Sequence, residues 1–312
     1  MTTSNSFDFT HNRDEVIKDA LITCGVMRPD ESLKSYNASF CSRVLNRMIK
    51  HMQTDAKQLW VHKIGYLFLQ KDQHKYTFGT DHIATAVNST ALRVAASDTD
   101  TTLEVDSTTG MTAADNIGIQ MDDGTVHWDT ISSVTDSDTV VITNGIDDDA
   151  AIDNVVYWYT NKITDPLRIS QCVYHYYDGT DARMEEIARS DYWDLANKTQ
   201  DTRPSQWYFD PQLAAAEIYL YGEPTTVKDY IIIHYQKQFS DMDATANNFE
   251  FPDEALETLT LGLAARLCDP YRVPADKARM IKAEAARAYR EWSTWDRETA
   301  TLTLQPKVHY GR

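Results

Sequence analysis

Residues 116–131 read NIGIQMDDGTVHWDTI, and this stretch decides much of the fold. Apolar and β-branched runs lie on both sides of Asp123-Gly124, a dipeptide typical of a tight hairpin turn. Similar runs recur every 9 to 15 residues between Thr80 and Lys162, separated by turn-forming pairs that contain glycine. The predicted strands are 103–105, 117–120, 126–131, 140–142 and 155–159. We therefore expect a small all-β module, either a barrel or a sandwich.

The same module holds most of the negative charge. The chain has a net charge of -17, and residues 80–165 contain 16 acidic residues against only Arg93 and Lys162. Most of these acids fall in the turns, which favours a solvated surface that keeps a β-rich module soluble. A calcium site at residues 147–149 is a weaker alternative, because three consecutive acids cannot all face one ion.

The two ends of the chain predict amphipathic helices. Asn12 and Glu15 have the spacing of a capping box, and Gly25 is placed to end the first helix. A second helix runs to about Met52, a third follows Pro252, and a fourth begins near Pro274. The fourth helix has apolar residues at alternating intervals of three and four, a narrow seam that needs a facing helix in the same chain or in a neighbouring copy. The seam residues are Ala278, Ile281, Ala285, Ala288, Trp292 and Trp295.

Between the helices and the module, further strands are predicted at 59–78, 167–177, 216–221 and 230–235, with a short helical stretch at 184–195. We therefore expect an α+β fold, with a helical body, a small β-sheet and the inserted barrel-like or sandwich-like all-β module. The host domain takes residues 1–79 and 166–300, the module takes 80–165, and an extended tail takes 301–312.

The sequence carries none of the common catalytic motifs. It contains no GxGxxG, GxxxxGK[ST], HExxH or GxSxG pattern, so we expect a protein that is not an enzyme and has no cofactor or metal. The cysteines Cys24, Cys41, Cys172 and Cys268 lack CxxC spacing and are expected to be reduced residues of the core. No apolar run is long enough to span a membrane, and the N-terminus lacks a signal-peptide pattern, which predicts a cytoplasm-like compartment.

One carbohydrate-active arrangement is suggested by the acids Glu185 and Glu186 near Tyr192, Trp193 and Trp207. Because the chain has 47 acidic residues, such proximity is expected by chance. Most of the 17 tyrosines and 7 tryptophans are predicted to build the sheet, and anchoring of a protein interface is the other interpretation.

Two segments resemble a known family. Residues 189–239 (RSDYWDLANKTQDTRPSQWYFDPQLAAAEIYLYGEPTTVKDYIIIHYQKQF) and 251–274 (FPDEALETLTLGLAARLCDPYRVP) are similar to the head-to-tail adaptor proteins of short-tailed bacteriophages, also called tail accessory or packaged-DNA stabilisation proteins. The matching positions are Gly222 and Pro224 in a turn, Tyr230, Ile232 and Tyr235 in a strand, and Pro252, Glu254, Ala255, Leu256 and Leu263 in a helix. The resemblance covers roughly residues 12–78 and 166–298, and the order of these short motifs is its distinctive feature.

The resemblance implies a ring of about twelve copies seated on the phage portal protein, at the head–tail junction of the virion, after assembly in the host cytoplasm. Such a ring forms part of the DNA conduit, lets DNA pass without sequence-specific binding, touches no membrane, and attaches downstream tail or nozzle proteins and fibres. The seam on the last helix is the expected ring interface. The basic C-terminal tail is expected to bind the portal through Leu302, Leu304, Lys307, Val308, Tyr310 and Arg312. Two alternatives stay open, another phage tail or decoration subunit and a carbohydrate-binding or carbohydrate-active protein.

Overall fold

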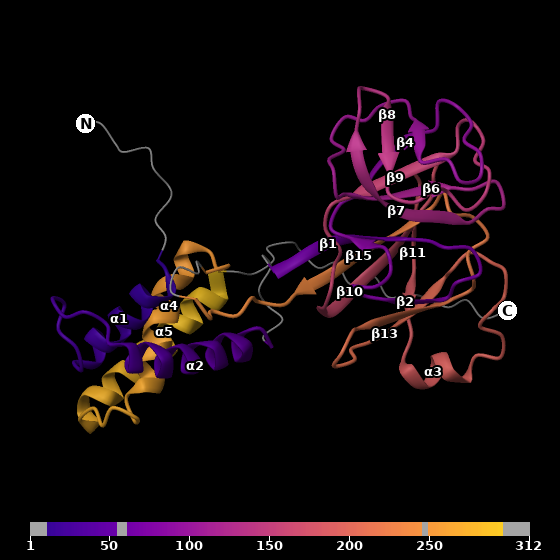
Figure 1. Ribbon diagram of the computed structural model, residues 1–312. Coiled ribbons are helices and arrows are strands. Elements are labelled where there is room, and N and C mark those ends of the chain that lie inside the picture. The colour runs from indigo at the N-terminus through magenta and orange to yellow at the C-terminus, as the bar shows by residue number, and fades with distance from the viewer. Residues whose placement is uncertain (1–10, 55–60, 245–248, 296–312) are drawn as a thin grey trace, which may run out of the picture. The chain divides into compact units, whose positions relative to one another are not determined.

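The computed structural model describes residues 11–54, 61–244 and 249–295 (Figure 1). The chain forms two compact units, a helical unit made by residues up to 60 and from 239 onward, and a β unit made by residues 61–238. Within the described ranges, no helix combines the length and the apolar composition needed to cross a lipid bilayer.

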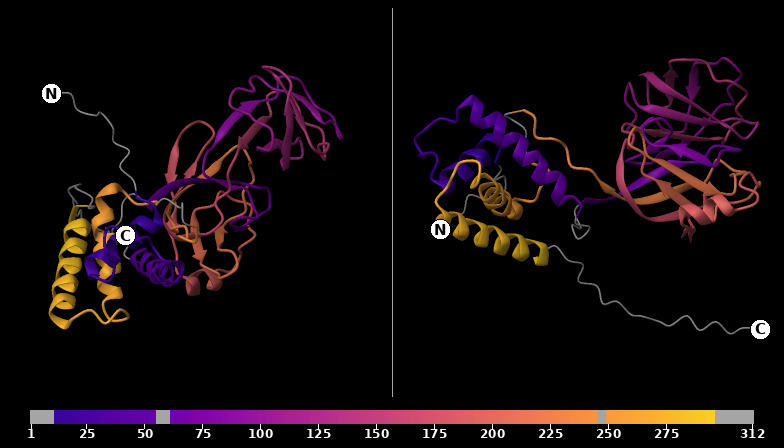
Figure 2. Two further views of the ribbon diagram at one scale, coloured as in Figure 1. Left: turned by 60° about the vertical axis from the view of Figure 1, so that its left-hand side comes forward. Right: turned by 90° about the horizontal axis from the view of Figure 1, so that it is seen from below.

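The helical unit combines helices from the N-terminal and the C-terminal segment of the chain. Its helices are α1 (Arg13–Cys24), α2 (Ser35–Met52), α4 (Leu256–Leu267) and α5 (Ala275–Trp295), and the 3-10 turn η2 (Asp253–Ala255) precedes α4. Helix α4 packs against each of the other three, and Figure 2 shows α5 lying alongside it. The free energy of this packing comes from the leucine face of α4, where Leu259, Leu263 and Leu267 are fully buried.

The capping box predicted at the start of α1 is confirmed. The backbone N–H of Glu15 donates to the Asn12 side chain at 3.0 Å, and the backbone N–H of Asn12 donates to the Glu15 carboxylate at 2.9 Å. Gly25 ends the helix with φ of 75°, a left-handed conformation that residues with a Cβ rarely adopt. These contacts satisfy backbone groups that a helix leaves unpaired at its ends.

The β unit contains a two-sheet sandwich. One sheet has the order β11-β10-β15-β1-β3 and the other the order β12-β13-β14-β2. The strands of the first sheet are β1 (His62–Phe68), β3 (Ile83–Ala84), β10 (Pro166–His175), β11 (Asp181–Arg183) and β15 (Tyr230–Lys237). Those of the second are β2 (Lys75–Thr77), β12 (Glu185–Glu186), β13 (Gln206–Asp210) and β14 (Glu217–Tyr221), and the short helix α3 (Arg189–Asp194) follows β12. Both sheets contribute to one core, which includes Ile231 and Ile233 from β15 and Trp207 and Ile218 from the second sheet.

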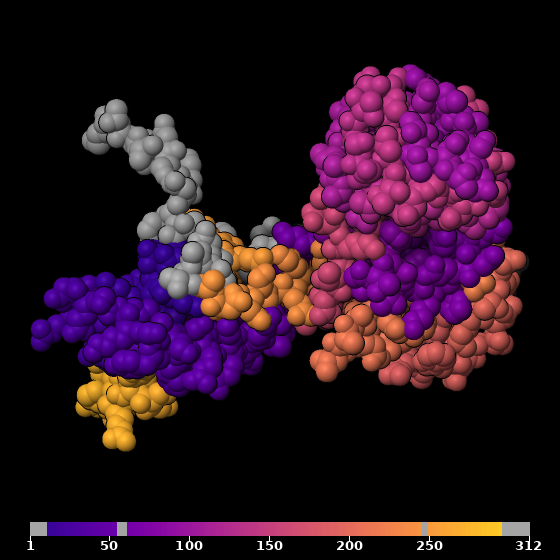
Figure 3. All heavy atoms as spheres, viewed as in Figure 1, coloured from indigo at the N-terminus to yellow at the C-terminus, as the bar shows by residue number. Residues whose placement is uncertain are grey.

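The remaining strands form a separate lobe in direct contact with the sandwich (Figure 3). They are β4 (Asn88–Ala91), β5 (Thr102–Glu104), β6 (Asn116–Gln120), β7 (Val126–Val134), β8 (Thr139–Ile142) and β9 (Val155–Tyr159), in the order β4-β9-β6-β7-β8-β5. The two outer strands meet through an antiparallel bridge between Leu92 and Val105, and the Arg93 N–H donates to the Glu104 carbonyl at 2.9 Å. This bridge closes the sheet into a barrel, which leaves neither outer strand as a free edge.

Aromatic side chains join the barrel to the sandwich. Phe68 of β1 lies among Trp128, Tyr157 and Tyr159 of the barrel, with ring centroids 5.0 to 5.6 Å away. Trp128 also stacks on His82 at 3.8 Å, and the His82 Nδ1 is 2.7 Å from the Tyr159 hydroxyl. The contact is built from strand residues on both sides, so it fixes the barrel on the sandwich.

The expected helical body with a small β-sheet is wrong. The structure is mostly β, with sheets of five, four and six strands. Several host strands have only two or three residues, which is too short to show the alternating pattern of a strand in the sequence. Within the predicted helix 184–195, residues 185–186 pair with β13 instead, and only Arg189–Asp194 are helical. The domain boundaries predicted at residues 80 and 165 stay predictions.

The junction gives a first testable prediction. Gly118 of β6 lies opposite Trp128, and a Cβ built on Gly118 would lie 2.5 Å from the Trp128 ring. Gly118→Val is expected to push Trp128 off His82 and to lower the free energy of unfolding by about 1–3 kcal/mol. Ser133→Val, at an exposed position of the same strand as Trp128, is the control and should change it by less than about 0.5 kcal/mol. Denaturant titration checks both, and equal stabilities would contradict the close packing.

The junction also predicts a pH dependence. Burial, together with the charge of Lys162, lowers the pKa of His82 from 6.5 to about 3. The folded protein therefore keeps His82 neutral where the unfolded chain binds a proton, so the free energy of unfolding falls as the pH drops from 6.5 towards 3.

His82→Phe is expected to remove this contribution, which has a slope of up to about 1.4 kcal/mol per pH unit. Tyr159→Phe is the matched control, because it removes the hydrogen bond and keeps the imidazole. The free energy of unfolding, measured at several pH values, should fall less steeply below pH 6.5 for His82→Phe than for the wild type or for Tyr159→Phe. An unchanged slope for His82→Phe would show that His82 does not titrate in this way.

Candidate functional site

The residues expected to contact partners fall into two groups. Leu302, Leu304, Lys307, Val308, Tyr310 and Arg312 lie outside the described residues. The seam residues Ala278, Ile281 and Trp292 are buried, with 9%, 3% and 5% of their surface exposed. Ala285 and Ala288 are partly buried, and Trp295 is the last residue of α5. Helix α5 packs on α4 of the same chain, so the seam has its facing helix there, and its contact with a second copy stays a prediction.

A groove of about 600 Å³ opens between α2, α4 and α5. Its lining residues are Met48, His51, Met52 and Thr54, Thr258, Gly262 and Arg266, and Ala285, Ala286 and Tyr289. Gly262 makes the close approach of α2 possible, because a Cβ there would lie 3.0 Å from the Met48 sulfur. Methionine and alanine side chains leave a floor that is apolar and adaptable in shape.

Two arginines lie close together at this groove. Arg266 is part of the lining, and Arg47 precedes Met48 on α2. Partial burial and the neighbouring charge of Arg47 lower the pKa of Arg266. Both side chains are exposed, and in the part of the chain that the structure describes neither forms an ion pair or a hydrogen bond. Among the described residues, the groove therefore combines apolar surface with positive charge that no carboxylate balances.

The other side of the α4–α5 contact is acidic. A smaller groove of about 190 Å³ is lined by Glu254, Glu257, Thr258, Leu261, Glu284, Arg287, Ala288, Glu291 and Trp292. Arg287 lies 3.5 Å from Glu291, whereas Glu254, Glu257 and Glu284 form no ion pair among the described residues. The Trp292 Nε1 is buried and has no hydrogen-bond partner within the same ranges.

The helix period explains how one helix pair has two such surfaces. On α4, Thr258, Gly262 and Arg266 are four residues apart and share one stripe, while Glu257 and Leu261 share the next stripe. We call the first surface the arginine groove and the second the acidic flank. Sequence reasoning missed both, although the glycine and arginine at intervals of four on α4 are visible in the sequence.

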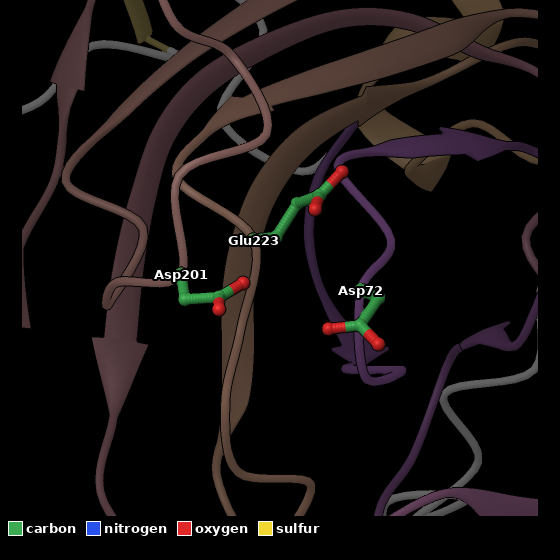
Figure 4. Close-up of side chains that lie close together, drawn as sticks. All are labelled: Asp72, Asp201 and Glu223. Carbon is green, nitrogen blue, oxygen red and sulfur yellow. The ribbon is translucent and has the colours of Figure 1, made fainter.

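A second cluster of charged groups lies at one end of the sandwich. The carboxylates of Asp72, Asp201 and Glu223 have oxygens within 4.8 Å of one another (Figure 4). Glu223 is only 8% exposed and is 2.7 Å from the His74 Nδ1, while Asp72 and Asp201 are exposed. Oxygen ligands of this type suit Ca²⁺ or Mg²⁺, but exposed acidic groups are common without an ion. The three charges repel one another in any case.

Of the rings in the carbohydrate-active arrangement, Trp207 is 1% exposed and Tyr192 is fully buried, so neither offers a ring face to a sugar, whereas Trp193 is exposed. A sugar site at Glu185 and Glu186 stays a prediction. Asp147 lies 2.6 Å from the His127 Nδ1, whereas Asp148 and Asp149 accept backbone N–H groups at separate places. The four cysteines are buried and free, which confirms the prediction for them.

A scan against models of protein families finds no match to this chain, and a search of curated proteins finds none either. A functional proposal therefore rests on the residues of this chain and on the resemblance of its ordered motifs.

The carboxylate cluster gives a testable prediction. Asp201→Asn is expected to raise the free energy of unfolding by about 0.5 kcal/mol at low ionic strength in EDTA, because it removes a like charge next to Asp72 and Glu223. The gain should shrink in about 0.5 M salt, where exposed charges are screened. Asp30→Asn, an exposed loop position in the helical unit, gives the background effect of one removed charge. A loss of stability for Asp201→Asn would mean that repulsion does not dominate.

Proposed function

We propose that this chain is a non-enzymatic head-to-tail adaptor of a tailed bacteriophage, which forms a ring on the portal and serves as part of the DNA conduit and as a platform for tail attachment. The proposal starts from the ordered motifs of residues 189–239 and 251–274. These two segments form α3, the strands β13, β14 and β15, and helix α4. The family resemblance therefore involves both compact units.

One structural observation supports an assembly role most directly. The α4–α5 pair presents the arginine groove on one side and the acidic flank on the other, and both carry charges that no described residue of this chain pairs. Unpaired charge beside apolar surface is typical of protein interfaces, where charge sets orientation and buried apolar groups supply affinity. Portal protein, further copies of the chain and downstream tail or nozzle proteins are the proposed partners.

The charge of the chain suits contact with moving DNA. Outside residues 80–165 the acidic and basic residues nearly balance, and the module itself is strongly acidic. Adhesion to DNA depends on many lysine or arginine contacts with phosphates, and its strength rises with their number. A conduit wall without a dense basic surface lets DNA slide. We place the protein at the head–tail junction of the virion.

The C-terminal tail gives the test of this proposal. Removal of residues 301–312 is expected to weaken binding to isolated portal at least tenfold, because the apolar and basic side chains of this segment are lost. Binding is measured by sedimentation or surface capture with intact portal rings. A full-length chain with residues 301–312 scrambled keeps composition and charge, so it separates sequence-specific docking from simple attraction.

Two results would count against the proposal in different ways. Undiminished docking of the truncated chain would remove the role of the tail but leave the adaptor in place. Failure of the full-length chain to bind portal rings would contradict the adaptor itself.

A further inference from the structure

The helical unit has two surfaces that lack partners of opposite sign. Arg266 lines an apolar groove and has Arg47 as a neighbouring charge, and neither arginine forms an ion pair among the described residues. Glu254, Glu257 and Glu284 line the acidic flank and likewise form no ion pair within those ranges. The arginine groove therefore lacks negative charges, which the acidic flank has, and the acidic flank lacks unpaired positive charges, which the arginine groove has.

We propose that copies of this chain associate head to tail, with the acidic flank of one helical unit seated in the arginine groove of the next. This inference rests on the proposed ring-forming function and names the two surfaces that make the ring contact. Because the surfaces lie on different sides of the same α4–α5 pair, the contact is heterologous, and repetition with rotation generates a ring.

The apolar residues of the two surfaces also match. Met48, Met52 and Tyr289 line the groove, and Leu261 and the edge of Trp292 lie on the flank. Methionines adapt their shape to a partner, and burial of such side chains supplies most of the free energy of an interface.

A nucleic acid is the other anion to consider for the arginine groove. Phosphate backbones are bound by many basic groups along a path. The groove has a floor of methionine, alanine and glycine beside its arginines, which favours an apolar partner with a few carboxylates. The acidic flank of a second copy has that chemistry.

Charge reversal tests the contact directly. Arg266→Glu and Glu284→Arg are each expected to reduce association between copies at least tenfold, because each puts like charges face to face. The double variant Arg266→Glu, Glu284→Arg should regain assembly. Association is measured on the full chain by sedimentation velocity over a range of concentrations, and by mass photometry of the chain bound to isolated portal rings.

A mixture of the two single variants is the sharper test. The groove of the Arg266→Glu chain is acidic and accepts the basic flank of the Glu284→Arg chain, while the reverse contact is the native one. An equal mixture is therefore expected to assemble although neither variant assembles alone. Arg279→Glu, on α5 but outside both linings, is the control and should assemble like the wild type. Circular dichroism establishes that each variant is folded.

The outcomes separate this inference from the proposed function. If the wild type forms rings and Arg266→Glu forms them equally well, the groove–flank contact is contradicted and the adaptor function stands. If the double variant and the mixture both fail while folded, the pairing of these two surfaces is also wrong. If the wild type forms no ring in solution or on portal, the ring-forming function itself fails.

Discussion

The structure depends on the packing of helix α4 against the apolar faces of three amphipathic helices. Its leucine face is fully buried, and α1, α2 and α5 each lie against it. Helices α1 and α2 end before residue 54 and α5 begins after residue 274, so the bundle forms only when segments far apart in the sequence pack together. The β unit, residues 61–238, separates these two segments in the sequence.

A second consequence concerns the barrel. The bridge between Leu92 and Val105 closes the sheet of the barrel, so that its outer strands are paired. The barrel also needs a fixed attachment to the sandwich. Ring contacts of Phe68 in the sandwich with Trp128 and Tyr159 in the barrel provide this attachment. The acidic turns then lie on a lobe whose core does not depend on the helices. The helical unit carries the arginine groove and the acidic flank, and these surfaces support the proposal that assembly runs through the helices.

Much of the local structure is predictable from sequence, whereas the proportion of β-sheet to helix in the whole fold is not. The capping box at Asn12 and the hairpin around Gly124 follow from short-range chemistry, and both occur as expected. Two-residue strands such as Glu185–Glu186 depend on pairing with β13, which follows only after an intervening helix and loop, so local pattern suggests a helix there. The seam of α5 has the right period, but the period does not tell whether the facing helix belongs to the same chain. Arg47 and Arg266 come together only through the packing of α2 on α4.

Direct imaging of the virus particle tests the central claim most simply. Under the proposed adaptor function, cryo-electron microscopy of virions that contain this chain should show a ring of copies between the portal and the tail, into which the helical unit and the β unit fit as separate bodies. Density for the chain in the tail tube or on the capsid surface, with none at the portal, would contradict the account.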